Sequence, residues 1–368
     1  MTAGEARIYY PELDGLRFFA FLLVFIHHAP ALGPPPLGLL KDIGWIGVDL
    51  FFALSAFLFV QILAAEYRKT GTISVPKFYI RRGLRIWPLY FLFCVLKIML
   101  SGGAWRGYLM SWRTLGLFTF TDNVFTAVRG YCQIPDTAHL WTISYEEQFY
   151  LVIPVMLLFF FRGGRKRAAW VLAGSAALFL GIRSLMIGAG VPHPAIWVLP
   201  VTHFESILLG IVVGLGGYDL LFRRIPLPLL LGSGLFLAWL MTRLPPIEAD
   251  GWSVMASYAL VGMGTSLVVH VVFRAGTAPW LRWITARPLV YLGKISYGLY
   301  VYHLLAISKG HRIIGHLFPS APPAGQNLME WCLAFAFTVG LAAVSYSLLE
   351  RPFLRLKKRF EVVHSRPA

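Results

Sequence analysis

Apolar residues follow one another along this chain in long blocks, and short segments between the blocks carry most of the polar residues. About 20 consecutive apolar residues span the hydrocarbon core of a bilayer as a helix. Ten blocks approach that length, at residues 13–33, 43–65, 84–101, 141–161, 168–188, 203–221, 226–243, 252–273, 288–307 and 328–349. The pattern predicts an all-α, polytopic membrane protein with about ten transmembrane helices.

The composition supports a membrane location and a single domain. Hydrophobic residues make up 57% of the 368 positions and charged residues 14%, whereas soluble domains contain about 25% charged residues. No segment between the blocks is long enough to fold alone. We therefore expect one integral-membrane domain over residues 1–368, with a short cytoplasmic tail at about 351–368.

The distribution of basic residues predicts the orientation, because cytoplasmic loops retain Lys and Arg. With the N-terminus inside, 22 of the 33 Lys and Arg residues fall in inner segments and 7 in outer segments. Both termini are therefore expected in the cytoplasm. Topology and anionic inner-leaflet lipid then account for most of the net charge of +16, so no nucleic-acid partner is expected.

The three cysteines, Cys94, Cys132 and Cys332, lie far apart in the sequence. This spacing signals neither a disulfide framework nor a zinc site. We expect structural packing for each, and we predict no metal site.

The first block, "LDGLRFFAFLLVFIHH", carries ionisable residues that a membrane disfavours. Such residues are costly in a span and by default mark a functional cavity. Arg17 and His28 are eleven positions apart, so a helix would place them on one face with a rise of about 16 Å. This helical position favours His28 over His27 as the histidine on the same face as Arg17. The alternatives are that Arg17 reaches lipid phosphate and that His28 only bonds a neighbouring helix.

Two further clusters also place ionisable residues in or next to apolar blocks. In "YIRRGLRIWPLYF", Arg82 and Arg85 are three apart and share a helix face, which suits phosphate binding as well as simple anchoring at the inner interface. In "HLWTISYEEQFYLVIP", Glu146 and Glu147 lie too deep for an ordinary loop charge. Either could act at a site or form a structural ion pair.

Other polar and aromatic residues in the same stretches complete the candidate site. Their types suit contacts to a polar substrate, although His303 could equally be an interfacial aromatic residue. We assign to substrate binding Asp14, Asp49, Ser55, Trp141, Tyr297 and His303.

Taken together, six stretches resemble acyltransferase family 3, the membrane-bound O-acyltransferases that include O-antigen and other cell-envelope O-acetylases. The resemblance covers nearly the whole chain, in the order "LDGLRFFAFLLVFIHH", "GWIGVDLFFALSAFL", "RRGLRIWPLY", "HLWTISYEEQFY", "ISYGLYVYHL" and "SYSLLERPF". One departure is Ser55-Ala56, where the family usually has Ser-Gly. A second is that we see no soluble esterase-like domain, which some members carry.

The resemblance implies a ten-helix core, acetyl-CoA or another acyl-CoA as cytoplasmic donor, and an acceptor hydroxyl presented from the other side. Carried over by position, it assigns donor binding to Arg17, Arg82 and Arg85. It assigns the family's buried histidine to His28 and the buried glutamate to Glu146 or Glu147. The protein would then lie in a bacterial inner membrane.

The residue chemistry agrees with this assignment. A cytoplasmic arginine cluster can hold the phosphates of coenzyme A while the thioester reaches inward along a polar cleft. His28 would act as general base on the acceptor hydroxyl, or accept the acyl group itself, with Glu146 or Glu147 orienting it. The expected acceptor is an envelope saccharide, with a macrolide or other small glycoside second, and the oligomeric state is open.

Two other classes of function compete with the enzyme. A transporter or flippase would also line its path with Arg, His and Glu, but it predicts repeats or broken helices that the sequence does not display. A sensor or scaffold would leave three clusters of buried ionisable groups unexplained.

Overall fold

The computed structural model describes residues 9–33, 37–241, 243, 253–276 and 278–363, and every regular element in that part of the chain is helical. In chain order the elements are α1 (Pro11–His28), α2 (Leu37–Ile43), α3 (Ile46–Thr70), α4 (Val75–Met99), η1 (Gly102–Ala104), α5 (Trp105–Leu109), α6 (Trp112–Phe118), α7 (Asp122–Arg129), η2 (Ala138–Leu140), α8 (Trp141–Gly188), α9 (Ala195–Val198), α10 (Glu205–Gly214), α11 (Gly217–Leu221), α12 (Leu227–Met241), α13 (Ser253–Ala275), η3 (Pro279–Thr285), α14 (Arg287–Lys294), α15 (Ser296–Leu317), α16 (Pro323–Ser345), η4 (Tyr346–Glu350), α17 (Arg351–Lys357) and η5 (Lys358–Phe360). The all-helical prediction is confirmed for these residues.

Several of the helices are long and apolar enough to cross a membrane. Among the described residues these are four, or five if the bent pair formed by α4 and the segment Gly102–Leu109 counts as one span. The predicted blocks at 141–161 and 168–188 both lie in α8, which is interrupted at Gly164 with φ 76°. The block at 288–307 breaks at Ile295 into α14 and α15. The count of about ten spans stays a prediction.

Helix α1 lies in the middle of the bundle, in contact with α3, α13, α14 and α15. Glycines permit this close packing. A Cβ added at Gly293 of α14 would lie 1.7 Å from the carbonyl oxygen of Asp14, and one at Gly47 of α3 would lie 2.3 Å from that of Ala20. The backbone of α1 is thus fixed by direct contact with two neighbouring helices.

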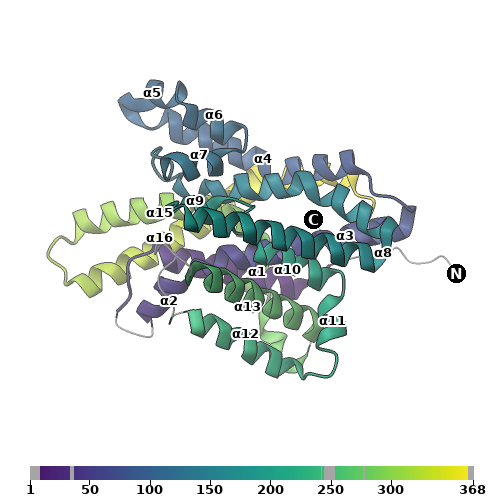
Figure 1. The fold of residues 1–368 in the computed structure, drawn as a ribbon. Coiled ribbons are helices and arrows are strands. Elements are labelled where there is room, and N and C mark those ends of the chain that lie inside the picture. The colour runs from purple at the N-terminus through teal and green to yellow at the C-terminus, as the bar shows by residue number, and fades with distance from the viewer. Residues whose placement is uncertain (1–8, 34–36, 242, 244–252, 277, 364–368) are drawn as a thin grey trace.

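A group of short helices, α5 to α7, stands out from one side of the bundle (Figure 1). The amide of Asn123 at the start of α7 bonds the side chain of Gln148 in α8 at 3.1 Å. Asp122 pairs with Arg113 at 3.1 Å, and burial raises the pKa of the Asp122 carboxyl to about 6. The first contact attaches α7 to α8, and the second joins the short helices α6 and α7 to each other.

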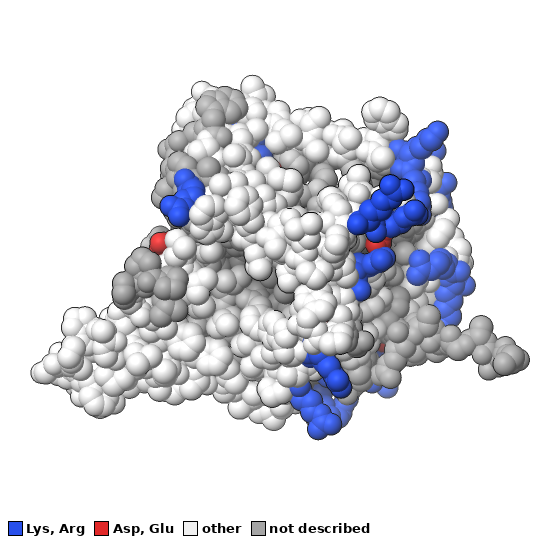
Figure 2. All heavy atoms as spheres, turned by 90° about the horizontal axis from the view of Figure 1, so that it is seen from below, with Lys and Arg blue, Asp and Glu red and all other residues white. Residues whose placement is uncertain are grey.

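Basic side chains gather toward one end of the face seen in Figure 2, while most of the remaining visible surface is uncharged. The α15–α16 hairpin extends at the opposite end (Figure 1). A largely uncharged face with cations at one end is typical of a protein that spans a bilayer.

The contact between α14 and α1 yields a test of the packing. Gly293→Ala adds a single methyl group that overlaps the backbone of Asp14, and backbone atoms cannot move aside by changing rotamer. We expect a loss of about 3 kcal/mol in unfolding free energy, measured by thermal unfolding in detergent.

Gly340→Ala in α16 is the control for Gly293→Ala. No atom lies within 4 Å of its added Cβ, and alanine favours a helix over glycine by about 1 kcal/mol. Equal stability of the Gly293→Ala protein and the unaltered protein would show that this helix contact is not as tight as described.

Candidate functional site

A basic cavity opens at the charged end of the bundle. Arg17 of α1 and Arg82 and Arg85 of α4 line it. The guanidinium of Arg82 lies over the ring of Phe59, 4.2 Å from its centroid. Four more cations complete the wall: Lys294, Arg351, Lys357 and Lys358.

The neighbouring Arg81 does not belong to this cavity. It is buried and pairs with Glu66 at 3.0 Å. Helical spacing does not explain the difference, since Arg81 is four positions from Arg85 and Arg82 is three. The pair with Glu66 turns Arg81 away from the cavity.

A second space, the middle cavity, lies deeper and shares walls with the first. Arg17, Arg82 and Arg85 line both. Glu146 of α8 faces the middle cavity, accepting hydrogen bonds from Ser55 at 3.3 Å and from Tyr150 at 2.8 Å. Tyr297 lines it too, and its hydroxyl donates to the carbonyl of Ile86.

The two adjacent glutamates point to different places. Glu147 accepts a hydrogen bond from the indole of Trp87 at 3.3 Å and is absent from the lining of the three cavities described here. The structure therefore places Glu146, and not Glu147, at the cavity that Arg17, Ser55 and Arg82 also line.

A third space, the histidine cavity, continues from the middle cavity at walls common to both, formed by Val48, Thr142 and Tyr300. His28, at the C-terminal end of α1, and Trp141 line it. The three cavities therefore lie next to one another in one row, which we call the line of cavities. Arg17 stands near its basic end and His28 at its other end, both on α1.

The hydrogen bonds of His28 define its tautomer. Its Nδ1 lies 2.9 Å from the carbonyl oxygen of Val24, which can only accept. Nδ1 therefore carries the proton, and in the neutral ring Nε2 keeps a lone pair. The side chain is exposed to the cavity. His28 thus presents a base to the histidine cavity.

His303 lies behind His28 and is fully buried. Its Nδ1 donates to the carbonyl of Tyr300, and its Nε2 lies 3.4 Å from Nδ1 of His28. Nε2 of His303 is thus an acceptor that can stabilise a positive charge on His28. The adjacent His27 contacts the carbonyl of Lys41 instead.

Lys41 in turn fixes the end of α1. Its ammonium donates to the carbonyls of His27 and Ala29, where a cation also complements the helix dipole. Burial lowers the pKa of Lys41.

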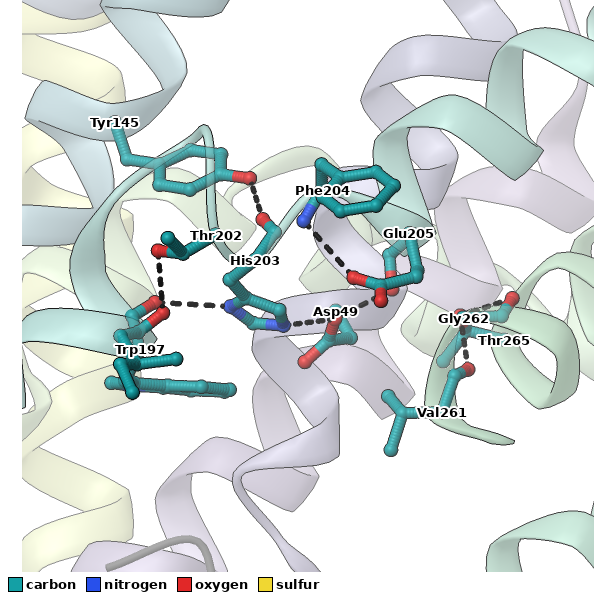
Figure 3. Close-up of polar contacts among 12 residues, drawn as sticks. Asp49, Tyr145, Trp197, Thr202, His203, Phe204, Glu205, Val261, Gly262 and Thr265 are labelled. Carbon is teal, nitrogen blue, oxygen red and sulfur yellow. Dashed lines mark hydrogen bonds and ion pairs between the residues drawn. The ribbon is translucent and has the colours of Figure 1, made fainter. Parts of the chain in front are cut away.

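Asp49 lies in a different environment from the other predicted substrate contacts. It is buried and accepts from Nε2 of His203 at 2.9 Å and from Ser206. Figure 3 shows its carboxylate beside His203, whose other ring nitrogen contacts the carbonyl of Trp197. The structure gives Asp49 a place in a closed polar network rather than in the line of cavities. Asp14, by contrast, lines the basic cavity and pairs with Arg17 at 3.3 Å.

Several lining residues escaped the sequence analysis. His139 and Tyr300 flank His303, with ring centroids 4.7 and 5.4 Å from it, and both line the histidine cavity. His139 begins the stretch that holds Glu146, so its position was a usable signal. In the described part of the chain, no group of three or more His, Cys, Asp or Glu residues is arranged to hold a metal ion.

Comparison with known proteins identifies the family. The family model described as an acyltransferase domain, Acyl_transf_3, matches residues 10–348. The chain therefore belongs to acyltransferase family 3, as the sequence motifs indicated.

Two similar proteins are from Staphylococcus aureus. "Putative O-acetyltransferase SACOL0978" of strain COL is 25% identical over 399 residues, covering 100% of this chain and 60% of that protein. "O-acetyltransferase OatA" of strain NCTC 8325 / PS 47 is 24% identical over 369 residues, covering 94% and 57%. The chain thus spans about three fifths of the length of these relatives. No solved structure matches.

The environment of Asp49 predicts a structural effect. Asp49→Ala leaves the buried His203 without its carboxylate, and breaking a buried pair in this way costs about 3 kcal/mol or more. We expect a lower thermal unfolding midpoint in detergent.

Asp219→Ala provides the comparison, because it removes an exposed pair with Arg274 at 2.7 Å and should cost under about 1 kcal/mol. Similar midpoints for the two variants would contradict a structural role for Asp49.

Proposed function

We propose that the protein is an O-acyltransferase that moves an acetyl or other short acyl group from cytoplasmic acyl-CoA to a hydroxyl of an envelope saccharide. One observation carries the proposal: a line of three adjoining cavities runs from seven cations at one end to an exposed imidazole at the other. Membership of the acyltransferase family supports it. The protein acts as one multi-pass domain of about ten spans in a bacterial inner membrane, with both termini in the cytoplasm.

The donor enters from the basic end. Coenzyme A is an anionic nucleotide on a long pantetheine arm, so its phosphates pair with the arginines of the basic cavity. The arm lies in the middle cavity, where the carboxylate of Glu146 can accept a hydrogen bond from an amide of the arm. The rise of about 16 Å between Arg17 and His28 along α1 matches the reach of such an arm.

The acceptor enters the histidine cavity from the other end. Indole and phenol rings line this space, and apolar ring faces suit the flat side of a sugar. They belong to Trp45, Tyr131, Trp141 and Trp197.

His28 is the general base. Its Nε2 takes the proton of the acceptor hydroxyl as the oxygen attacks the thioester carbonyl. The carbon–sulfur bond then breaks, and the leaving thiolate takes the proton from His28. His303 and the carbonyl of Val24 hold the ring by its Nδ1–H. They take the orienting role that the sequence analysis gave to a glutamate.

Removing the base tests the mechanism. His28→Gln should lower kcat of acetyl transfer by about 100-fold or more, because glutamine cannot accept the proton. The measurement is transfer of radiolabelled acetyl from acetyl-CoA by purified protein in detergent, without any ion gradient.

His316→Gln is the matched control, since His316 is exposed near the end of α15 and away from the three cavities. Full transfer by the His28→Gln protein would refute the role of His28. A requirement for a gradient would favour the transporter alternative.

The paired glutamates give a second test. Glu146→Gln removes the carboxylate that faces the middle cavity, and we expect kcat/KM for acetyl-CoA to fall at least about tenfold. Glu147→Gln should stay within about twofold, because its contact to Trp87 lies outside the path. The reverse order of effects would assign the site to Glu147.

A further inference from the structure

The C-terminal segment forms part of the basic cavity. Three of its seven cations, Arg351, Lys357 and Lys358, come from α17 and η5. The sequence analysis treated this segment as a tail, and it lies beyond residues 10–348, which the family model matches. Arg351 stands in the last of the six stretches, "SYSLLERPF", but neither that stretch nor the family match assigns these three residues a role.

The segment is held firmly against the bundle. Helix α17 packs on α4, and the buried guanidinium of Arg81 donates to the carbonyl of Phe360 at 2.9 Å while pairing with Glu66. Lys69 donates to the carbonyl of Val362 at 3.3 Å. The segment is therefore a fixed wall of the cavity.

A single turn of π-helix, η4, joins α16 to α17. A π-helical turn adds one residue, so the side chains that follow it are rotated about the helix axis. Such turns are frequent at functional sites. Arg351, Leu354 and Lys358 then share the face that lines the cavity. Arg355 and Arg359 are exposed and do not line it.

The cavity holds far more positive than negative charge. Of its two acidic residues, Asp14 pairs with Arg17, and Glu361 lies 3.4 Å from the ammonium of Lys357. Crowded like charges repel one another, so an anionic ligand stabilises this arrangement.

The cations fall into two sets by depth. Arg17, Arg82 and Arg85 line both the basic and the middle cavities, whereas Lys294 and the three C-terminal cations line only the basic cavity. A donor whose arm occupies the middle cavity therefore leaves its most distant part, the phosphorylated nucleotide, beside the C-terminal segment.

We propose that Arg351, Lys357 and Lys358 form a subsite for the phosphorylated nucleotide of the donor, and that this subsite selects acyl-CoA over acyl carriers that lack a nucleotide. The inference rests on the proposed function. The deeper arginines, Arg17, Arg82 and Arg85, bind the phosphopantetheine arm, which both kinds of carrier contain.

The experiment compares two donors on purified full-length protein in detergent, acetyl-CoA and S-acetyl-4′-phosphopantetheine. The test variant combines Arg351→Gln, Lys357→Gln and Lys358→Gln. Loss of three partly exposed charge contacts should raise KM for acetyl-CoA about 30-fold with kcat within about twofold. KM for S-acetyl-4′-phosphopantetheine should not change.

Two variants control for charge and folding. Arg355→Gln with Arg359→Gln removes two cations from the outer face of the same segment and should leave both donors unaffected. Lys357→Arg with Lys358→Arg keeps the charges and should retain a KM for acetyl-CoA near that of the unaltered protein. A KM rise of equal size for both donors, or none for either, overturns the inference.

Binding of coenzyme A by calorimetry on the same samples separates this inference from the proposed function. If the unaltered protein transfers acetyl from neither donor but binds coenzyme A about 30-fold more tightly than the triple variant, the proposed function fails and the subsite stands. Equal binding of coenzyme A by both overturns the subsite.

Discussion

Ionisable side chains inside an apolar helical bundle are stable only where they face a partner, a ligand or a water-filled space, and the architecture of this protein follows from that constraint. Some of its buried charges are closed off in pairs: Asp49 with His203, Arg81 with Glu66, and Arg183 with Glu205 at 2.6 Å. Others open onto the line of cavities. The closed pairs hold helices together, whereas the open groups remain available to a ligand.

Helix α1 links the two ends of that line. It carries Arg17 at the basic cavity and His28 at the histidine cavity, so one rigid element fixes their separation. Close contacts with α14 at Gly293 and with α3 at Gly47 fix the helix in turn. A shift of α1 would move Arg17 and His28 together. The two glycines that hold α1 stand next to residues that line the cavities, Lys294 and Val48.

The sequence predicted the all-helical class, the family, and the placing of Arg17 and His28 on one helix, because these depend on hydrophobic blocks, local motifs and helical periodicity. Helical periodicity does not show which of two adjacent residues faces a cavity when this depends on the position of a neighbouring helix. Glu146 and Glu147 therefore needed the structure, as did Asp49, whose partner His203 is 154 positions away. The C-terminal segment that carries Arg351, Lys357 and Lys358 was predicted to be a tail, because its packing on the bundle depends on Arg81, which lies far away in the sequence.

The central claim is that donor and acceptor meet inside the bundle from opposite faces of the membrane. Sealed vesicles of defined orientation test it directly, with labelled acetyl-CoA supplied only at the face that carries the basic cavity and a membrane-impermeant saccharide acceptor only at the other. The account predicts label on the acceptor across the intact membrane. Transfer only when donor and acceptor share one face would contradict it.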